Sequence, residues 1–171
     1  MTGALRLRPL LPHDEGPALT AHAALAEEGF AFLLGLDPAE SWLSYLQRLR
    51  DNSRGLNVAR DWVPATFLAA TLGGELVGRI SIRHELNDFL AAYGGHIGYA
   101  VVPGHRRRGH ATTMLSQGLV IARSLGIDRV LVTCDDDNSG SARAIESNGG
   151  VLESVVDRPG SPVPLRRYWI C

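Results

Sequence analysis

The chain has 171 residues, of which 45% are hydrophobic and 20% are charged, and its formal net charge at neutral pH is -1. This length suits one globular domain over residues 1–171 and is short for two. The near-neutral charge excludes a domain that grips nucleic acid across a broad basic face. The apolar runs are shorter than the roughly 20 residues that cross a bilayer, and the N-terminus lacks the apolar block of a secretion signal. We therefore expect a cytoplasmic protein with no membrane partner.

The first third of the chain predicts one strand and two helices. Residues Leu5–Pro9 alternate apolar side chains with Arg, which is typical of a strand. The patterns over Asp14–Gly29 and Ala39–Arg50 then predict two helical segments.

Antiparallel strands are predicted to dominate the middle third. Thr66–Leu72 and Glu75–Arg83 read as the two strands of a hairpin, because the Gly73-Gly74 pair between them supplies the positive φ angles of a tight turn. Gly95–Val102 predicts a further strand, which ends at Pro103 because proline cannot donate to a ladder.

The last third alternates helices with strands. Apolar or small residues recur at helical spacing over Ala111–Leu125, and Gly126 ends this helix. The remaining segments are a strand, a helix and two strands, at Arg129–Cys134, Ser139–Asn148, Val151–Asp157 and Leu165–Cys171. The order β α α β β β α β α β β predicts an α/β (α+β) fold with seven strands and four helices.

Residue types narrow the chemistry. Cys134 and Cys171 are the only cysteines, which excludes a disulfide framework and a cysteine-rich zinc site, and we expect no bound metal. All 17 basic residues are Arg and none is Lys. A P-loop requires Lys after its glycines, so a P-loop nucleotide-binding protein is disfavoured.

The segment VVPGHRRRGHAT, residues 101–112, has the features of an anion site. It ends a strand at Pro103 and begins a helix near Gly109, where unpaired N–H groups and the helix dipole favour a phosphate. Arg106–Arg108 add positive charge, and Arg presents a fork of donors suited to phosphate. The alternative is a solvated turn with a basic patch.

The context of this segment favours a particular family. A buried strand follows it, and Asn138 then begins a helix that ends in Asn148-Gly149-Gly150. This combination resembles the GNAT superfamily of N-acetyltransferases, and the strings GGHIGYAVVP, TCDDDN and IESNGG are similar to a bacterial branch described only as predicted acetyltransferases. The resemblance covers the chain in element order and is specific from Gly94 to Gly150. It implies a GNAT-like, mixed and mostly antiparallel central sheet, with acetyl-CoA as cosubstrate.

The resemblance also implies which residues hold the cofactor. Backbone groups of Tyr99, Ala100 and Val101 would pair with the pantetheine amides. Asn138 matches a side chain that binds pantetheine near its thiol, and a helix N-cap is its alternative role. The expected cofactor-binding residues are Tyr99, Ala100, Val101, Arg106, Arg107, Arg108, Gly109, His110, Ala111, Thr112, Asn138 and Ser141.

Acetyl transfer to an amine needs a neutral amine, a polarised carbonyl and a proton for the departing thiolate. The resemblance implies that a backbone N–H near Val101 polarises the carbonyl. His96 stands where many relatives carry Glu and is the first candidate base, because its ordinary pKa is about 6.5; a core histidine bonded to a backbone carbonyl is the alternative. Glu85 is the second candidate base, and a surface polar residue is its alternative.

Two positions depart from the family pattern. Thr133 replaces a Glu that other relatives use, and Ile145 replaces the usual general acid, a Tyr. Tyr99, Ser141 and Cys134 are candidate acids, with ring packing, a helix-start hydroxyl and a buried hydrophobe as their alternatives. The thiolate, with a pKa of about 8.5, can also take its proton from water.

Further alternatives concern the reaction route and the acceptor. Cys134 could carry the acyl group itself, but no His partner is readable, so we favour direct transfer. Asp135–Asp137 form either a solvated turn or an acidic mouth that attracts a cationic amine. Tyr168–Ile170 is expected to be a core strand, with the acceptor pocket or a homodimer contact as alternatives.

The sequence thus predicts an acetyl-CoA-dependent N-acetyltransferase acting on the primary amine of a small, cationic molecule. An amino acid, a polyamine-like metabolite and an antibiotic are the candidate acceptors, and an N-terminal peptide amine stays open. The alternative is a GNAT-like module that holds acyl-CoA as a sensor or structural partner without turnover, because the usual acid is missing at Ile145.

Overall fold

The computed structural model describes residues 3–171. The predicted order of strands and helices is confirmed. The bounds are β1 Arg6–Arg8, α1 Glu15–Ala26, α2 Trp42–Ser53, β2 Ala65–Leu72, β3 Glu75–Arg83, β4 Ile97–Val101, α3 His110–Ser124, β5 Val130–Asp135, α4 Ser139–Ser147, β6 Val151–Val156 and β7 Leu165–Ile170.

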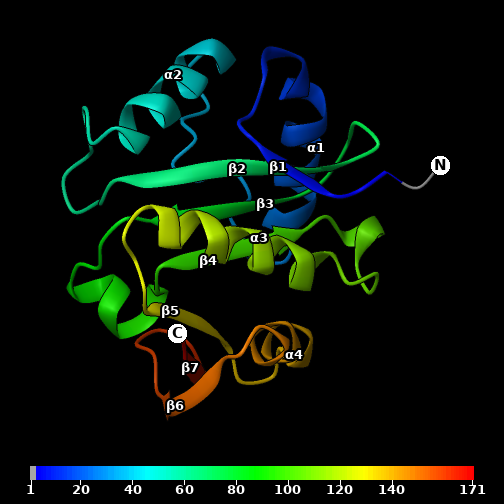
Figure 1. The fold of residues 1–171 in the computed structure, drawn as a ribbon. Coiled ribbons are helices and arrows are strands. Elements are labelled where there is room, and N and C mark those ends of the chain that lie inside the picture. Colours follow the sequence, from blue (N-terminus) through cyan, green and yellow to red (C-terminus); the bar gives the residue numbers. More distant parts are fainter. Residues whose placement is uncertain (1–2) are drawn as a thin grey trace.

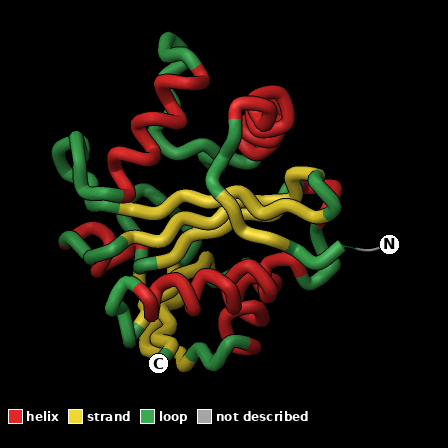
Figure 2. The backbone as a smooth tube through the Cα atoms, turned by 45° about the horizontal axis from the view of Figure 1, so that its top comes forward, coloured by secondary structure: helices red, strands yellow, loops and turns green. Residues whose placement is uncertain are grey.

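The strands form one seven-stranded sheet in the order β1-β2-β3-β4-β5-β7-β6. All neighbours are antiparallel except β4 and β5, which run parallel. Helices α1 and α2 lie over one face of the sheet, near β2, while α3 and α4 lie on the other side (Figures 1 and 2). The mixed, mostly antiparallel sheet implied by the resemblance is therefore confirmed.

Each face of the sheet packs its own hydrophobic core, because successive strand residues point to opposite faces. The core under α3 and α4 includes the completely buried Met114 and Tyr168. The core under α1 and α2 includes the completely buried Phe32 and Tyr45. Strand β3 contributes to both cores, so it forms the middle of the molecule.

Strands β4 and β5 separate soon after they meet. Their only paired register is Ile97 with Val132, after which β5 pairs with β7 alone. Backbone groups on a strand alternate between its two neighbours, and Val102 N–H donates to Val77 O on β3 at 2.9 Å. The N–H and C=O groups of Tyr99 and Val101 therefore face the opposite way, into the gap between β4 and β5.

The connection from β3 to β4 contains a π-helical segment, Leu90–Gly94, that the sequence pattern did not predict. It is held against β7 by Arg167, which donates hydrogen bonds to the carbonyls of Ala91 and Ala92. No helix among residues 3–171 is long and apolar enough to cross a membrane.

Candidate functional site

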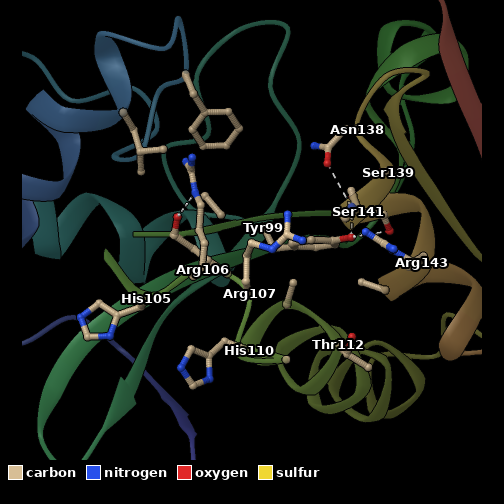
Figure 3. A pocket seen from close by; sticks show the side chains of 18 of the residues that line it. Tyr99, His105, Arg106, Arg107, His110, Thr112, Asn138, Ser139, Ser141 and Arg143 are labelled. Atoms are coloured by element: carbon tan, nitrogen blue, oxygen red, sulfur yellow. Dashed lines mark hydrogen bonds between the residues drawn. The ribbon is translucent and has the colours of Figure 1, made fainter. Parts of the chain in front are cut away.

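A cavity of about 780 Å³ opens where β4 and β5 separate. Its walls come from β4, the loop before α3, the first turn of α3, the start of α4 and the end of α1 (Figure 3). We call this cavity the β4 groove. The groove extends from the gap between β4 and β5 to the N-terminus of α3. Extended strand backbone and N–H groups that can bind an anion therefore line the same cavity.

The loop that leads into α3 is shaped for close approach to its backbone. Arg107 and Gly109 adopt positive φ angles of 63° and 79°, which turn the chain sharply before the helix. The first hydrogen bond of α3 runs from Thr113 N–H to Gly109 O at 3.1 Å. The N–H groups of His110, Ala111 and Thr112 lie in the turn before it. These groups lack helical partners and carry the positive end of the dipole, which makes an anion site.

The three loop arginines have different surroundings. Arg106 forms a two-pronged ion pair with Glu28 at 3.1 and 2.7 Å, and its Nε donates to Val101 O at 3.2 Å. Arg107 lines the groove, whereas Arg108 does not. Arg143 on α4 also lines it and was not predicted from the sequence. The charge available to an anion in the groove therefore comes from Arg107 and Arg143 more than from Arg106.

Tyr99 extends from β4 toward Ser141 on α4 (Figure 3), and their hydroxyl oxygens are 2.7 Å apart. Burial raises the pKa of Tyr99 to about 12, so its hydroxyl is protonated at neutral pH. Cys134 is buried nearby, and burial raises the pKa of its thiol to about 11. A thiol of this kind is a weak nucleophile at neutral pH.

Asn138 caps α4, since its Oδ1 accepts from Ser141 N–H at 3.0 Å. The capping alternative is thus observed, and the side chain lines the groove as well. Ile145, where the family usually has its acid, is completely buried in the core under α3 and α4.

The two candidate bases lie outside the groove. His96 is buried, and its Nδ1 accepts a hydrogen bond from Leu131 N–H at 2.9 Å. Burial and the charge of Arg83 lower the pKa of His96, so the ring is neutral and carries its proton on Nε2. This tautomer donates and has no free lone pair with which to accept a proton from an amine. Glu85 is exposed in the loop after β3.

The acidic mouth that was one of the two alternatives for Asp135–Asp137 is largely neutralised. Asp135 pairs with Arg158 at 3.0 Å, and Asp136 pairs with Arg166 at 2.6 Å. Asp137 is the member of the run that lines the groove. The folded chain therefore has no strongly acidic entrance at Asp135–Asp137 that would attract a cation.

Of the twelve residues expected to bind the cofactor, all except Arg108 line the β4 groove. Ala100 does so from a strand position paired with Arg79, so its backbone groups are directed toward β3. Sequence reasoning missed the wall that follows α1, which includes Glu28 and Phe30, because no motif in that segment marks it. Among residues 3–171, no group of three or more His, Cys, Asp or Glu side chains is arranged to hold a metal ion.

A family comparison matches most of the chain. The acetyltransferase (GNAT) family matches residues 30–149, which include β2 to α4 and the whole of the loop before α3. No curated protein sequence matches the chain at a significant level.

Solved structures share the fold at low sequence identity. RimJ of Mycobacterium smegmatis, in complex with CoA-disulfide, is 22% identical with a TM-score of 0.73, over 98% of this chain and 82% of that one. YncA of Salmonella typhimurium, solved with its cofactor acetyl-CoA, is 16% identical with a TM-score of 0.65, over 98% and 94%. RimL, a ribosomal L7/L12 α-N-protein acetyltransferase in complex with coenzyme A, is 18% identical with a TM-score of 0.65, over 96% and 92%.

Proposed function

Because the chain belongs to the acetyltransferase (GNAT) family, we propose that it is an N-acetyltransferase that moves an acetyl group from acetyl-CoA directly to the primary amine of a small molecule. One observation carries this proposal. The unpaired β4 backbone and the N-terminus of α3 open into the same groove.

The groove fits the two ends of the cofactor. The backbone groups of Tyr99 and the N–H of Val101 can pair with the pantetheine amides as an added strand would, since β5 leaves them unpaired, whereas Val101 O already accepts from Arg106 Nε. The first turn of α3, with Arg107 beside it, suits the pyrophosphate. Asn138 Oδ1 is used by the helix cap, so its amide NH₂ group is the part that can reach the cofactor.

The acetyl-CoA thioester supplies the acetyl group: its C–S bond breaks as the amine nitrogen bonds to the carbonyl carbon, the nitrogen loses one proton and the thiolate gains one. We assign the thiolate's proton to the Tyr99 hydroxyl, which is protonated, lines the groove and is held by Ser141. The groove is open to solvent, so water takes the proton from the amine and resupplies Tyr99.

Direct transfer agrees better with the surroundings of Cys134 than an acyl-enzyme does. The thiol is buried, and its raised pKa keeps it protonated at neutral pH. A nucleophilic cysteine needs a lowered pKa or an adjacent base. The neighbour that Cys134 has on α4 is Ser141, which is not a base.

Incubation with acetyl-CoA and a panel of amines tests the function. Free thiol is followed optically, and the acetylated product is identified by mass. We expect turnover with at least one amine and release of one thiol per product. Acetyl-CoA binding without turnover of any amine would favour the sensor, and absence of both would overturn the proposal.

Two matched glycine substitutions test the site. Gly109 and Gly126 both have positive φ, and a Cβ at either would meet no atom within 4 Å. Alanine therefore introduces a similar backbone strain at both positions, but only Gly109 lines the groove. We expect Gly109→Ala to weaken acetyl-CoA binding by about 10-fold or more and Gly126→Ala to leave it unchanged. Equal affinities in the two variants would contradict the assignment of the loop.

A further inference from the structure

The face of the sheet under α1 and α2 carries two arginines that no carboxylate neutralises. Arg79 and Arg83 lie four residues apart on β3, and their partners on β4 are Ala100 and His96. Side chains four residues apart on a strand point to the same face. None of the ion pairs among residues 3–171 includes either arginine.

Arg79 is satisfied by backbone carbonyls. Its guanidinium donates to Phe32 O at 3.0 Å, to Ala31 O at 2.9 Å and to Gly98 O at 3.3 Å. The rings of Phe30 and Phe67 lie on either side, 4.9 and 5.7 Å from its Cζ. Arg79 is thus a structural residue that ties the loop after α1 to the sheet.

Arg83 lacks such partners. Within residues 3–171, its guanidinium makes one side-chain hydrogen bond, a long one of 3.5 Å to Gly94 O, although a guanidinium carries five N–H donors. The guanidinium lies flat against β4, since a Cβ at Gly98 would be 2.9 Å from Arg83 Nη1. Burial lowers the pKa of Arg83, and no carboxylate lies beside the guanidinium to offset that effect.

The neighbours of Arg83 add to the positive potential. The charge of Arg83 contributes to the lowered pKa of both Arg79 and His96. The neutral His96 presents an Nε2–H donor, because Leu131 N–H occupies its Nδ1. A partly buried cation with uncommitted donors and no acidic neighbour favours an anion that arrives with a ligand.

This cation lies beside the reaction site that we propose. Gly98, against which the guanidinium rests, directly precedes Tyr99, and it is partly exposed on the α1 and α2 face. Along a strand, one to three residues from Gly98 to the Tyr99–Val101 backbone span about 3–10 Å. An acceptor whose amine and anion are a few bonds apart can therefore reach both.

From these contacts we infer that the acceptor carries a carboxylate, which Arg83 holds through its guanidinium fork while the amine faces the thioester. The inference rests on the proposed function and narrows its acceptor to amines of the amino-acid type. It replaces the cationic acceptor expected from Asp135–Asp137, two of which are engaged in ion pairs.

Matched acceptor pairs test the inference. Glycine, alanine, methionine and phenylalanine are compared with their carboxamides, which keep the amine and lose the negative charge. The amine of a carboxamide is the less basic one, so intrinsic reactivity at neutral pH favours the amide. We expect kcat/KM with the wild-type protein to favour the acid of at least one pair by about 10-fold or more. Equal values, or a preference for the amide in every pair, would overturn the inference.

Variants assign the effect to Arg83. Arg83→Gln should bring the acid-to-amide ratio to within about 2-fold of one, and Arg83→Lys should give an intermediate ratio because it keeps the charge but loses the fork. Gly98→Ala should also reduce the ratio, since the added Cβ displaces the guanidinium and leaves its charge in place. Arg50 is exposed, so Arg50→Gln is the matched control and should keep the wild-type acid-to-amide ratio. An unchanged ratio in Arg83→Gln, with folding verified by thermal unfolding, would overturn the assignment.

A binding measurement separates this inference from the proposed catalysis. Calorimetry in the presence of CoA compares N-acetylmethionine with N-acetylmethioninamide. If no amine turns over, binding of the acid that Arg83→Gln abolishes would support the carboxylate site and refute the catalysis. Absence of both binding and turnover would overturn both.

Discussion

Replacement of Tyr99 by Phe removes the hydroxyl that we assign as the proton donor and keeps the ring. The hydroxyl lies 2.7 Å from Ser141 Oγ, and burial raises the pKa of Tyr99 to about 12. A positioned general acid contributes roughly 10²–10⁴-fold to the rate. The departing thiol has a pKa of about 8.5, which makes it a fair leaving group without help. We therefore expect Tyr99→Phe to lower kcat by about 100-fold, the lower end of that range, which corresponds to an activation free energy higher by about 2.7 kcal/mol.

A merely structural hydroxyl gives a different result. Loss of one hydrogen bond then lowers the free energy of unfolding by about 1 kcal/mol and leaves kcat nearly unchanged. Steady-state kinetics, the acetyl-CoA dissociation constant and urea unfolding of the same variant distinguish the two cases. Tyr93→Phe makes the same change outside the groove and serves as the control.

The pH dependence gives a second, independent readout. A hydroxyl with a pKa of about 12 stays protonated through the neutral and mildly alkaline range. The wild-type kcat should therefore show no alkaline decline below about pH 10. A kcat of Tyr99→Phe within about 3-fold of wild type, with acetyl-CoA affinity unchanged, would refute the acid role.

Three further substitutions test the fold around the site. Burial and a neighbouring arginine lower the pKa of His96, so the unfolded chain binds more protons below about pH 6.5 and stability falls as the pH drops. His96→Asn keeps an acceptor for the backbone bond, and it should lessen the fall of the urea midpoint between pH 7 and pH 5; an unchanged fall would show that the burial of His96 does not set this pH dependence. Gly78→Ala places a Cβ 2.5 Å from Ala100 O and should lower the free energy of unfolding by about 1–3 kcal/mol, with weaker acetyl-CoA binding; an unchanged urea midpoint would contradict the clash. Arg79→Met leaves three carbonyls without their donor and should cost about 3 kcal/mol in urea unfolding, and a loss below about 1 kcal/mol would show that the guanidinium is not needed.

Local patterns predicted the elements because each has a short-range cause. The Gly73-Gly74 turn has φ angles of 58° and 89°, the two positive values that a tight hairpin requires. Pro103 ends β4 and Asn138 caps α4, as their side chains dictate. Causes of this kind act over a few residues, so they are readable from one sequence.

The π-helical segment Leu90–Gly94 was missed because its cause is distant in sequence. Arg167 lies 75 positions away from Ala92, and its hydrogen bond to the Ala92 carbonyl at 2.7 Å is visible only after β7 has been placed. The same applies to Arg106, which its neighbours in the sequence, Arg107 to Gly109, predict to bind phosphate. Its actual partner is Glu28, 78 positions away.

The net charge around the site cannot be taken from neighbouring residues in the sequence, because ion pairs between distant residues neutralise part of it. Asp135 and Asp136 suggest an acidic mouth, but arginines from the loop before β7 and from β7 itself neutralise them. Arg83 is one of 17 arginines, and it differs from Arg79 on the same strand because it is largely buried in the described fold with neither a carboxylate nor a set of close carbonyl acceptors around its guanidinium. An acceptor responds to the charges that remain after internal pairing, because a paired charge has little left to offer a ligand. The sign of the acceptor's anchoring group therefore follows from Arg83, a residue that no sequence motif singles out.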